Sequence, residues 1–520
     1  MLQSQDSSGW QGSLQLPPEA RIKPSSKGIV VFSGGSAANS LVDVFNGVAE
    51  NNASTLSYVI PISDNGGSSS ELIRVFGGPG IGDLRSRLVR LIPDNGDPNS
   101  EAGAIKELFN HRLPKDCRSA RQEWLDIIEA QHSIWHNISS PKKELIRSFL
   151  NSMNMEIVKR LRPSSRFDFS GASIGNLFLT GARLFSGSLE SAIYLLSSVC
   201  SVPASISVLP VINTSFTHHI SAGLSDGSVI TGQNNISHPS APIASLPIEA
   251  RDSPTRILRE TEEQDKVEDA NLPGTLPSLR KPAIQFSKDD EESLPARISR
   301  IWYINPYGAE ITLPANSRVL AALENASCII YSIGSLFTSI IPSLILRGVG
   351  DAVANPTIRS KILILNGSID RETGPKDSPF SAMDFVAAIA DACASSRSSA
   401  PVHRPSIPGP SPTPSESATR QPSPSPITTF SEPSSYPYKV PRSEYWQYVT
   451  HIIYIEGEGT PKVDRALFAE CGIECLRLYG RKGGDGTARY DAKALAQALE
   501  MVLGRRDFRR DQTRRNTLER

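Results

Sequence analysis

Two aspartates stand in glycine-rich segments, where a carboxylate can hold a divalent cation beside a phosphate group. Asp64 begins the segment Asp64-Asn65-Gly66-Gly67-Ser68-Ser69, and Asp83 ends the segment Gly77-Gly78-Pro79-Gly80-Ile81-Gly82-Asp83. Carboxylate oxygens are ligands for Mg²⁺, and glycine lets the backbone approach an anion closely. The simpler interpretations are an Asx turn at Asp64 and a helix N-cap at Asp83.

Arg85 follows Asp83 by two residues and adds a positive charge to the same segment. Its planar guanidinium can neutralise a phosphate through two parallel hydrogen bonds. We therefore assign Asp64 and Arg85 as candidate catalytic residues and Asp64 and Asp83 as candidate metal ligands, with Mg²⁺ as the expected metal. His218 and His219 are adjacent, but no third ligand is evident in the sequence.

Glycine-rich turns also follow other apolar segments. Gly34-Gly35-Ser36 follows the apolar run from Gly28, Gly175-Asn176 begins a helical pattern, and Gly334-Ser335 follows the apolar run from Ser327. Each turn alone has an ordinary explanation as a turn or a cap, but all lie at strand ends, where open α/β sheets bind ligands. The nucleotide-binding candidates are Gly34, Gly35, Ser36, Asn65, Gly66, Gly67, Ser68, Gly175, Asn176, Gly334 and Ser335.

The first of these turns differs from two well-known phosphate loops. It has no Gly-Lys-Ser/Thr, so it is not a Walker loop. It also lacks the three spaced glycines of the dinucleotide fingerprint, so no flavin or nicotinamide cofactor is implied.

The elements that must position these residues are apolar strands alternating with helices. Strands are predicted at 28–33, 56–62, 206–211, 228–231, 300–304, 327–332, 361–365, 449–455 and 474–478, with helices at 177–185, 189–199, 316–324, 380–394 and 492–503. Continuous apolar strands separated by helices indicate an α/β fold with a mostly parallel sheet covered on both faces. Between Lys106 and Arg162, charged helical segments predict a helical insertion.

The composition predicts that long inserts interrupt a single α/β domain. The 39 prolines are many, and segments rich in proline and serine cannot bury enough apolar surface to fold. We expect a disordered leader at 1–27, the first part of the domain at 28–237 with the helical insertion at about 106–162, a disordered insert at 238–296, the second part at 297–394, a Ser/Pro-rich linker at 395–437, the last part at 438–504 and a basic tail at 505–520.

The charge balance and the cysteines favour some function classes over others. Lysine plus arginine and aspartate plus glutamate both number 54, so the formal net charge is zero and nucleic acid is an unlikely partner. The six scattered cysteines form neither a disulfide framework nor a zinc pattern, and reduced thiols suit a cytoplasmic protein. No run of eighteen apolar residues occurs, so no membrane span is expected.

The chain resembles the 2-phospho-L-lactate transferase (CofD-like) family, and within it the branch that includes the bacterial gluconeogenesis factor. The resemblance spans most of the chain predicted to be ordered and is carried, in family order, by the segments 33–36, 63–69, 80–85, 171–177, 333–339 and 361–366. It implies a Rossmann-like, doubly wound sheet, a nucleotide or nucleotide-sugar ligand and a homodimer. In the transferase branch, a lactyl phosphate group moves from a guanosine diphosphate carrier to a deazaflavin precursor with Mg²⁺. In the regulator branch, the cleft binds a UDP-sugar and no reaction is implied.

The sequence departs from the family pattern at four places. Ala37 replaces a glycine, Asn65 replaces the second of two adjacent aspartates, Ala172 replaces a histidine, and Ser332 to Ser335 replaces Gly-Pro-Gly-Ser. Asn65 removes one carboxylate, which weakens any metal site made of two adjacent acids.

Three functions therefore stay open. The first is a nucleotide-sugar-binding metabolic regulator that resembles the gluconeogenesis factor. The second is an Mg²⁺-dependent transferase of the 2-phospho-L-lactate type with a nucleoside diphosphate-linked donor. The third is a non-catalytic scaffold.

Overall fold

The computed structural model describes residues 28–237, 276, 279, 293–397 and 439–504, except residues 36, 65, 94, 95, 98, 162–165 and 484–487. The predicted leader and basic tail lie outside the described residues, as does most of the two predicted inserts. Leu294 is only 1% exposed, so packing resumes shortly before the predicted start of the second part at 297.

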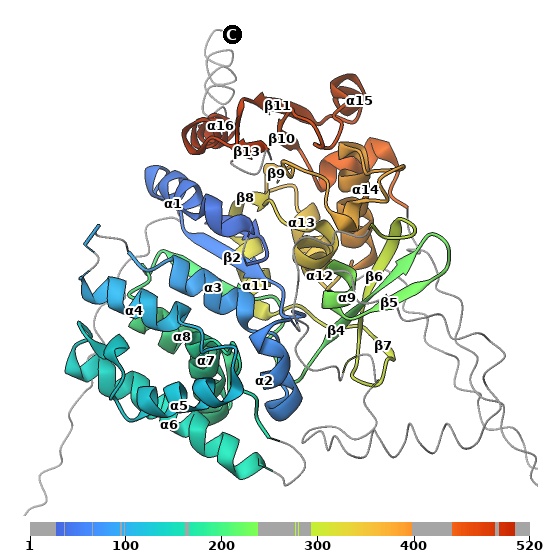
Figure 1. Ribbon diagram of the computed structural model, residues 1–520. Coiled ribbons are helices and arrows are strands. Elements are labelled where there is room, and N and C mark those ends of the chain that lie inside the picture. Colours follow the sequence, from blue (N-terminus) through green and yellow to red (C-terminus); the bar gives the residue numbers. More distant parts are fainter. Residues whose placement is uncertain are drawn as a thin grey trace, which may run out of the picture.

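Seven strands form one parallel sheet, which confirms the predicted α/β class (Figure 1). The spatial order is β11-β10-β9-β8-β1-β2-β3, and each neighbouring pair is parallel. The strands are β1 Gly28–Phe32, β2 Leu56–Ile60, β3 Ile206–Pro210, β8 Ala326–Tyr331, β9 Ser360–Ile364, β10 His451–Ile455 and β11 Glu474–Leu478. Every residue of β1 and β9 is buried, as expected for strands covered on both faces.

Helices lie on both sides of this sheet (Figure 1). The α-helices are α1 Val42–Asn51, α2 Ser68–Phe76, α3 Gly82–Arg90, α4 Glu101–Asn110, α5 Cys117–Ile128, α6 Ser140–Arg160, α7 Ile174–Ser186, α8 Leu189–Val199, α9 Gln233–Ser237, α11 Ser317–Glu324, α12 Ile341–Leu344, α13 Val349–Ala354, α14 Ala382–Ser395, α15 Arg465–Glu470 and α16 Ala492–Gly504. Shorter turns are η1 Ala37–Leu41, η2 Ser133–Trp135, η6 Arg371–Thr373 and η7 Arg442–Gln447, and η5 Leu336–Ile340 is a π-helix. Helices α4 to α6 form the predicted helical insertion, although α4 begins five residues before Lys106.

Local sequence accounts for several helix starts. Ser381 directly precedes α14, and its backbone N–H and hydroxyl donate to the Asp384 carboxylate at 2.7 and 2.8 Å. Asn316 caps α11 by accepting the backbone N–H of Arg318 at 3.0 Å.

A second sheet was not predicted. Strands β4 His219–Leu224, β5 Val229–Thr231, β6 Ile298–Ile304 and β7 Glu310–Ile311 pair antiparallel in the order β5-β4-β6-β7. The predicted strands at 228–231 and 300–304 exist, but they belong to this sheet rather than to the parallel one. The prediction was wrong because β4 and β6 pair across the long insert, a partnership that no local pattern reports.

Two smaller differences concern a hairpin near the carboxyl end and the length of β2. The segment from Gly480, for which no strand was predicted, forms the antiparallel hairpin β12 Gly480–Lys482 and β13 Ala488–Tyr490, and residues 484–487 between them lie outside the described part. Strand β2 ends at Ile60, two residues earlier than predicted.

The strand order creates a switch point between β1 and β8. From β1 the chain builds outward through β2 to β3, and after the second sheet it returns to β8 and builds in the other direction to β11. In open α/β sheets, ligands bind outside the carboxyl ends of the strands at such a point. A ligand site is therefore expected at the segments that follow β1, β2 and β8.

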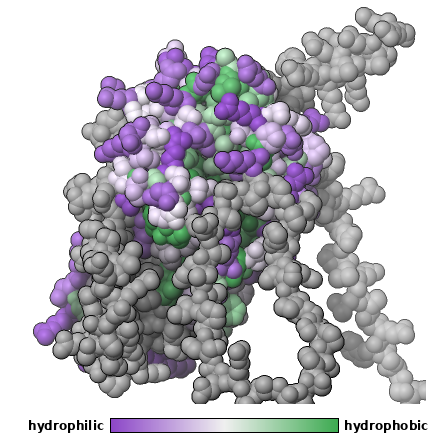
Figure 2. Space-filling view, turned by 90° about the vertical axis from the view of Figure 1, so that its right-hand side faces the viewer, coloured by the Kyte–Doolittle hydropathy of each residue, from purple (hydrophilic) through white to green (hydrophobic). Residues whose placement is uncertain are grey.

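On the side of the molecule that Figure 2 displays, hydrophilic residues and smaller apolar patches are intermixed over the described part. Within the described ranges, no helix has both the length and the apolar content that a membrane crossing requires.

Candidate functional site

Three glycine-rich segments meet at the carboxyl edge of the sheet. A β-carbon added to Gly35, after β1, would lie 2.0 Å from Oδ1 of Asp83 at the start of α3. A β-carbon on Gly82 would lie 3.3 Å from Oδ2 of Asp64, after β2. Gly34 similarly faces Ser339 of η5, whose hydroxyl would be 2.5 Å from an added β-carbon. The turns after β1, β2 and β8 thus form one cluster, with the carboxylates of Asp64 and Asp83 inside it.

The two carboxylates influence each other. Burial and, next in size, the negative charge of Asp64 raise the pKa of Asp83 to about 7, while the backbone of Gly35 stabilises the ionised form by hydrogen bonding. Burial also raises the pKa of Asp64, although the backbone N–H of Gly66 donates to its Oδ1 at 2.9 Å. The two neighbouring carboxylic acids therefore resist ionising together. A divalent cation bound between them would stabilise their ionised forms.

The carboxylates present at this site fit Mg²⁺. Mg²⁺ is usually held by one or two carboxylates together with the phosphates of its ligand, so Asp64 and Asp83 are a sufficient protein contribution. Within the described ranges, no group of three or more histidine, cysteine, aspartate or glutamate side chains is arranged to hold a metal without such a ligand.

Gly80 allows the third segment to lie directly on the second. Its backbone N–H donates to the carbonyl of Ile62 at 2.8 Å, and an added β-carbon would lie 2.0 Å from the backbone oxygen of Asp64. This close approach places Asp83 beside Asp64, and it explains why this position of the glycine-rich segment excludes a side chain.

Replacing Gly80 by alanine should therefore destabilise the protein and separate the two carboxylates. We expect a loss of about 1–3 kcal/mol, the usual cost of forcing extra atoms into a packed region. The measurement is the unfolding midpoint in urea. The matched control is Gly47→Ala in α1, where an added β-carbon meets nothing within 4 Å and should stabilise the helix by roughly 0.5–1 kcal/mol. Equal effects of the two substitutions would contradict this packing argument.

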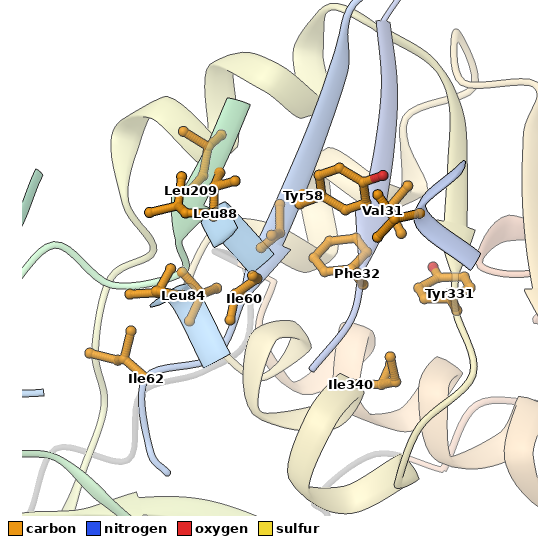
Figure 3. Close-up of a cluster of buried hydrophobic side chains, with 14 of the residues drawn as sticks. Val31, Phe32, Tyr58, Ile60, Ile62, Leu84, Leu88, Leu209, Tyr331 and Ile340 are labelled. Atoms are coloured by element: carbon orange, nitrogen blue, oxygen red, sulfur yellow. The ribbon is translucent and has the colours of Figure 1, made fainter. Parts of the chain in front are cut away.

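Hydrophobic packing fixes the helix that carries Asp83. Leu84 and Leu88 of α3 are buried and point toward Ile60 and Leu209 on the neighbouring strands (Figure 3). Because side chains four residues apart share one helix face, this contact sets the rotation of α3. Asp83 is thereby held beside the first glycine turn.

Arg87, one helical turn after Asp83, lies beneath that first turn. Its side chain is fully buried, and its Nη2 donates to the Gly34 carbonyl at 3.1 Å and to the Ser33 hydroxyl at 3.3 Å. Its guanidinium lies 4.5 Å from the ring centre of Tyr58. Burial lowers the pKa of Arg87 to about 10, so it remains a cation near neutral pH. Arg87 was not among the predicted site residues, although its spacing of four residues from Asp83 places both side chains on one face of α3.

Arg85 connects α3 to α4 and α7. Its Nε donates to Oδ1 of Asn176 at 3.3 Å, and its Nη1 donates to Oδ1 of Asn110 at 3.0 Å. Gly175 allows this arrangement, since an added β-carbon would lie 2.8 Å from Cγ and Cδ of Arg85. Arg85, Gly175 and Asn176, predicted from separate segments, are therefore brought together, and Asn110 is a partner that the sequence did not reveal.

The turn after β8 has its donors largely engaged by the protein. The backbone N–H of Gly334, where φ is +139°, donates to Oδ1 of Asn366 at 2.9 Å. The Glu372 carboxylate accepts the backbone N–H groups of Phe337 and Thr338 at 2.9 and 3.1 Å, and the Thr338 hydroxyl at 2.6 Å. A carboxylate of the protein thus lies at the start of η5, in a place where Rossmann-like folds can hold a phosphate.

A second acidic pair accompanies this turn. The Ser335 hydroxyl bonds the side chain of Asp370. Burial and then the charge of Asp370 raise the pKa of Glu372 to about 8, and burial raises that of Asp370 as well. The proposed ligand contacts of Gly334 and Ser335 stay predictions, with fewer free donors than the sequence implied.

Helix α9 also borders the site and was not anticipated. Gln233 accepts the Ser63 hydroxyl at 2.7 Å, and Oδ1 of Asn234 would be 2.5 Å from a β-carbon on Gly66. Arg371 of η6 donates to the carbonyl of Ile236 at 3.2 Å. No motif surrounds α9, which directly precedes the long insert, so local sequence carried no signal for it.

Some predicted residues have no described geometry. Ser36 and Asn65 lie outside the described residues, and of Ser68 only its place as the first residue of α2 is described. Gly67, which precedes α2, has a φ of +53°, a backbone conformation that favours glycine.

Comparisons with known proteins agree on one family. The model of the family described as 2-phospho-L-lactate transferase CofD matches residues 29–408. A protein of Saccharomyces cerevisiae, described as uncharacterized, is 38% identical over 463 residues, which cover 86% of this chain and 95% of that protein. The gluconeogenesis factor of Halalkalibacterium halodurans is 23% identical over 367 residues, covering 71% and 74% of the two chains.

Solved structures agree on the fold. A crystal structure of a UPF0052 family protein from Bacillus halodurans superposes with a TM-score of 0.51 and 17% identity, covering 91% of this chain and 99% of the other. A second crystal structure of a Bacillus halodurans protein gives the same TM-score and identity and covers 98% of its chain.

Proposed function

The chain belongs to the CofD family, and on this premise we propose that it binds the diphosphate of a nucleotide or nucleotide-sugar between the turns after β1 and β2. Asp64 and Asp83 would hold Mg²⁺, and the turns at Gly34, Gly35 and Gly66, where glycine permits a close approach, would lie beside the phosphates. Helix α3 would add its positive N-terminal end.

One observation carries this proposal: the Asp64 and Asp83 carboxylates come together beside the Gly35 turn, at the switch point of a parallel sheet. Mg²⁺ bound there would neutralise phosphate charge and the mutual repulsion of the two acids. The buried cation of Arg87 beneath the turn adds to the positive potential that an anion would meet.

A metabolic regulator that resembles the gluconeogenesis factor is the function that we favour. The Gly66-Gly67-Ser68-Ser69 run is similar to that branch, and Asn65 leaves the second segment with one carboxylate. Such a protein would bind a UDP-sugar without converting it. Cytoplasmic residence and a homodimer are part of the same proposal.

A transferase is the second candidate, because the family model itself carries that activity in its description. Arg85 lies near Asp83 and could stabilise negative charge on a phosphate during its transfer to an acceptor hydroxyl. The donor would be a nucleoside diphosphate-linked compound, and a nucleoside monophosphate would be released.

Titration of the full chain with nucleotides separates these functions. Native mass spectrometry of freshly purified protein would identify a co-purifying nucleotide and the oligomeric state. Calorimetric titration with UDP-sugars, UDP and GDP, with and without Mg²⁺, would then measure binding, and chromatography would detect turnover. We expect saturable, Mg²⁺-strengthened binding of a diphosphate ligand. Mg²⁺-dependent release of a monophosphate would favour the transferase, and no diphosphate binding at all would refute the proposal.

A further inference from the structure

A concentration of positive charge lies at the N-terminus of α7. We call it the arginine subsite and define it by Arg85, Asn110, Arg112, Ser173, Gly175 and Asn176. Arg85 is almost fully buried, whereas Arg112 is exposed. Arg112 and Ser173 are neighbours through an isolated antiparallel β-bridge, so both stand at the entrance to α7.

The cations of this subsite have only uncharged hydrogen-bond acceptors. Arg85 donates to the side-chain oxygens of Asn176 and Asn110, and Arg112 donates to the carbonyl of Gly171 at 3.3 Å. Among the described residues, neither arginine forms an ion pair with a carboxylate, although the charge of Asp83 reaches Arg85.

The two arginine side chains are therefore not neutralised by an ion pair among the described residues. Burial and then the charge of Arg112 lower the pKa of Arg85 to about 10, which shows that the two cations act on each other. The N-terminal end of the 13-residue helix α7 adds positive partial charge at the same place, although the backbone N–H of Ile174 donates to the carbonyl of His111 at 3.1 Å.

An unused donor and a cavity point to a ligand rather than to a structural role alone. Ser173 is fully buried, does not cap α7 with its side chain, and its hydroxyl has no hydrogen-bond partner. Asn110, which holds Arg85, also lines a cavity of about 590 Å³ between the segment after α3 and α4. That volume is in the range of small-molecule sites, which is roughly 300–1,000 Å³. Four of the other lining residues are polar, namely Asp97, Ser100, Lys106 and Glu107, and the rest are small or apolar.

We propose that the arginine subsite binds the oxyanion group, a carboxylate or a phosphate, of a second ligand whose remaining part occupies the cavity beside Asn110. This inference builds on the proposed function, because it places a separate ligand next to the nucleotide. The guanidinium groups would hold the oxyanion from two sides, and the Ser173 hydroxyl would donate to it. A site for two ligands would suit either an acceptor substrate or a co-regulator.

Oxyanion-dependent stability of the full chain tests the proposal. The probes are inorganic phosphate and acetate at up to about 20 mM, balanced with chloride at constant ionic strength, and the readout is the unfolding midpoint. At least one probe should raise the midpoint of the wild type by roughly 1–2 °C, since binding to the folded state alone stabilises it. Arg112→Gln should abolish the rise, and Arg112→Lys should keep part of it because it retains charge without the planar fork. The control Arg118→Gln removes an exposed arginine of α5 and should behave as the wild type.

The outcomes separate this inference from the proposed function. Equal stabilisation of Arg112→Gln and wild type, or no stabilisation by either probe, would overturn it. A response to phosphate alone would identify a phosphoryl group, and a response to acetate alone would identify a carboxylate. Mg²⁺-dependent diphosphate binding, measured in the same variants, should be unchanged by Arg112→Gln. An Arg112-dependent oxyanion effect without any nucleotide binding would refute the nucleotide site and leave the arginine subsite standing.

Discussion

Replacing Asp64 by asparagine should weaken Mg²⁺-dependent nucleoside diphosphate binding by about 10²-fold, because even partners that only orient a metal ligand contribute 10- to 100-fold to metal affinity. Asparagine keeps an oxygen that can accept the Gly66 N–H, so the turn after β2 should persist while the negative charge is lost. If the protein is a transferase, its turnover should fall by a similar ~10²-fold, the scale for losing a charge-stabilising group. Calorimetric titration with and without Mg²⁺ measures the first effect.

Asp226→Asn is the matched control for this substitution. Asp226 accepts the backbone N–H of Ser228 at 2.9 Å, two residues ahead, as Asp64 does from Gly66, but it is exposed in the turn before β5. Its replacement should leave Mg²⁺-dependent binding unchanged. If Asp64→Asn bound diphosphate as tightly as Asp226→Asn in the presence of Mg²⁺, Asp64 would not be a metal ligand.

Replacing Glu372 by glutamine should remove a large part of the pH dependence of stability. The raised pKa of about 8 means that the folded state keeps a proton that an ordinary glutamate, with a pKa of 4.5, releases on unfolding. Stability contributed by this proton is complete below about pH 4.5 and is lost as the pH rises to about 8. Each pH unit in that window costs about 1.4 kcal/mol per proton. Glutamine resembles the protonated acid, so the variant should unfold at a higher urea concentration than the wild type at pH 9.

Urea midpoints measured from pH 5 to pH 9 test this prediction. Glu144→Gln is the control, since the Glu144 side chain is 70% exposed on α6 and should change the pH dependence little. The same slope in wild type and Glu372→Gln would show that Glu372 is ionised throughout. Its three hydrogen bonds from Phe337 and Thr338 would then outweigh the cost of burying the charge.

The sequence predicted the parallel sheet well because each strand carries its own signal. β1 and β8 are continuous apolar runs that end in glycine-containing turns, and these features depend only on neighbours along the chain. The antiparallel β4–β6 pair depends instead on residues separated by the long insert, so its short strands could not be assigned to a sheet of their own.

The same distinction applies to the candidate site. Asp64, Asp83 and Arg85 were found from residue type and spacing, since parallel strands must bring their carboxyl ends to one edge. Contacts between distant segments were not predictable: Asp83 against Gly35, Arg85 against Asn110, and α9 against the turn at Gly66.

The amino-acid sequence by itself determined that acidic, glycine-rich turns would lie at the ends of buried strands. The apolar runs that form these strands and the glycines that form the turns depend only on residues close together along the chain. Only the tertiary structure decided which of those turns keep free donors and which are already satisfied. The Glu372 carboxylate occupies the start of η5. Among the described residues, by contrast, the Arg112 guanidinium bonds only a backbone carbonyl and the buried Ser173 hydroxyl has no hydrogen-bond partner. That outcome depends on which side chains from distant segments reach each strand end, and the tertiary packing of those segments decides this.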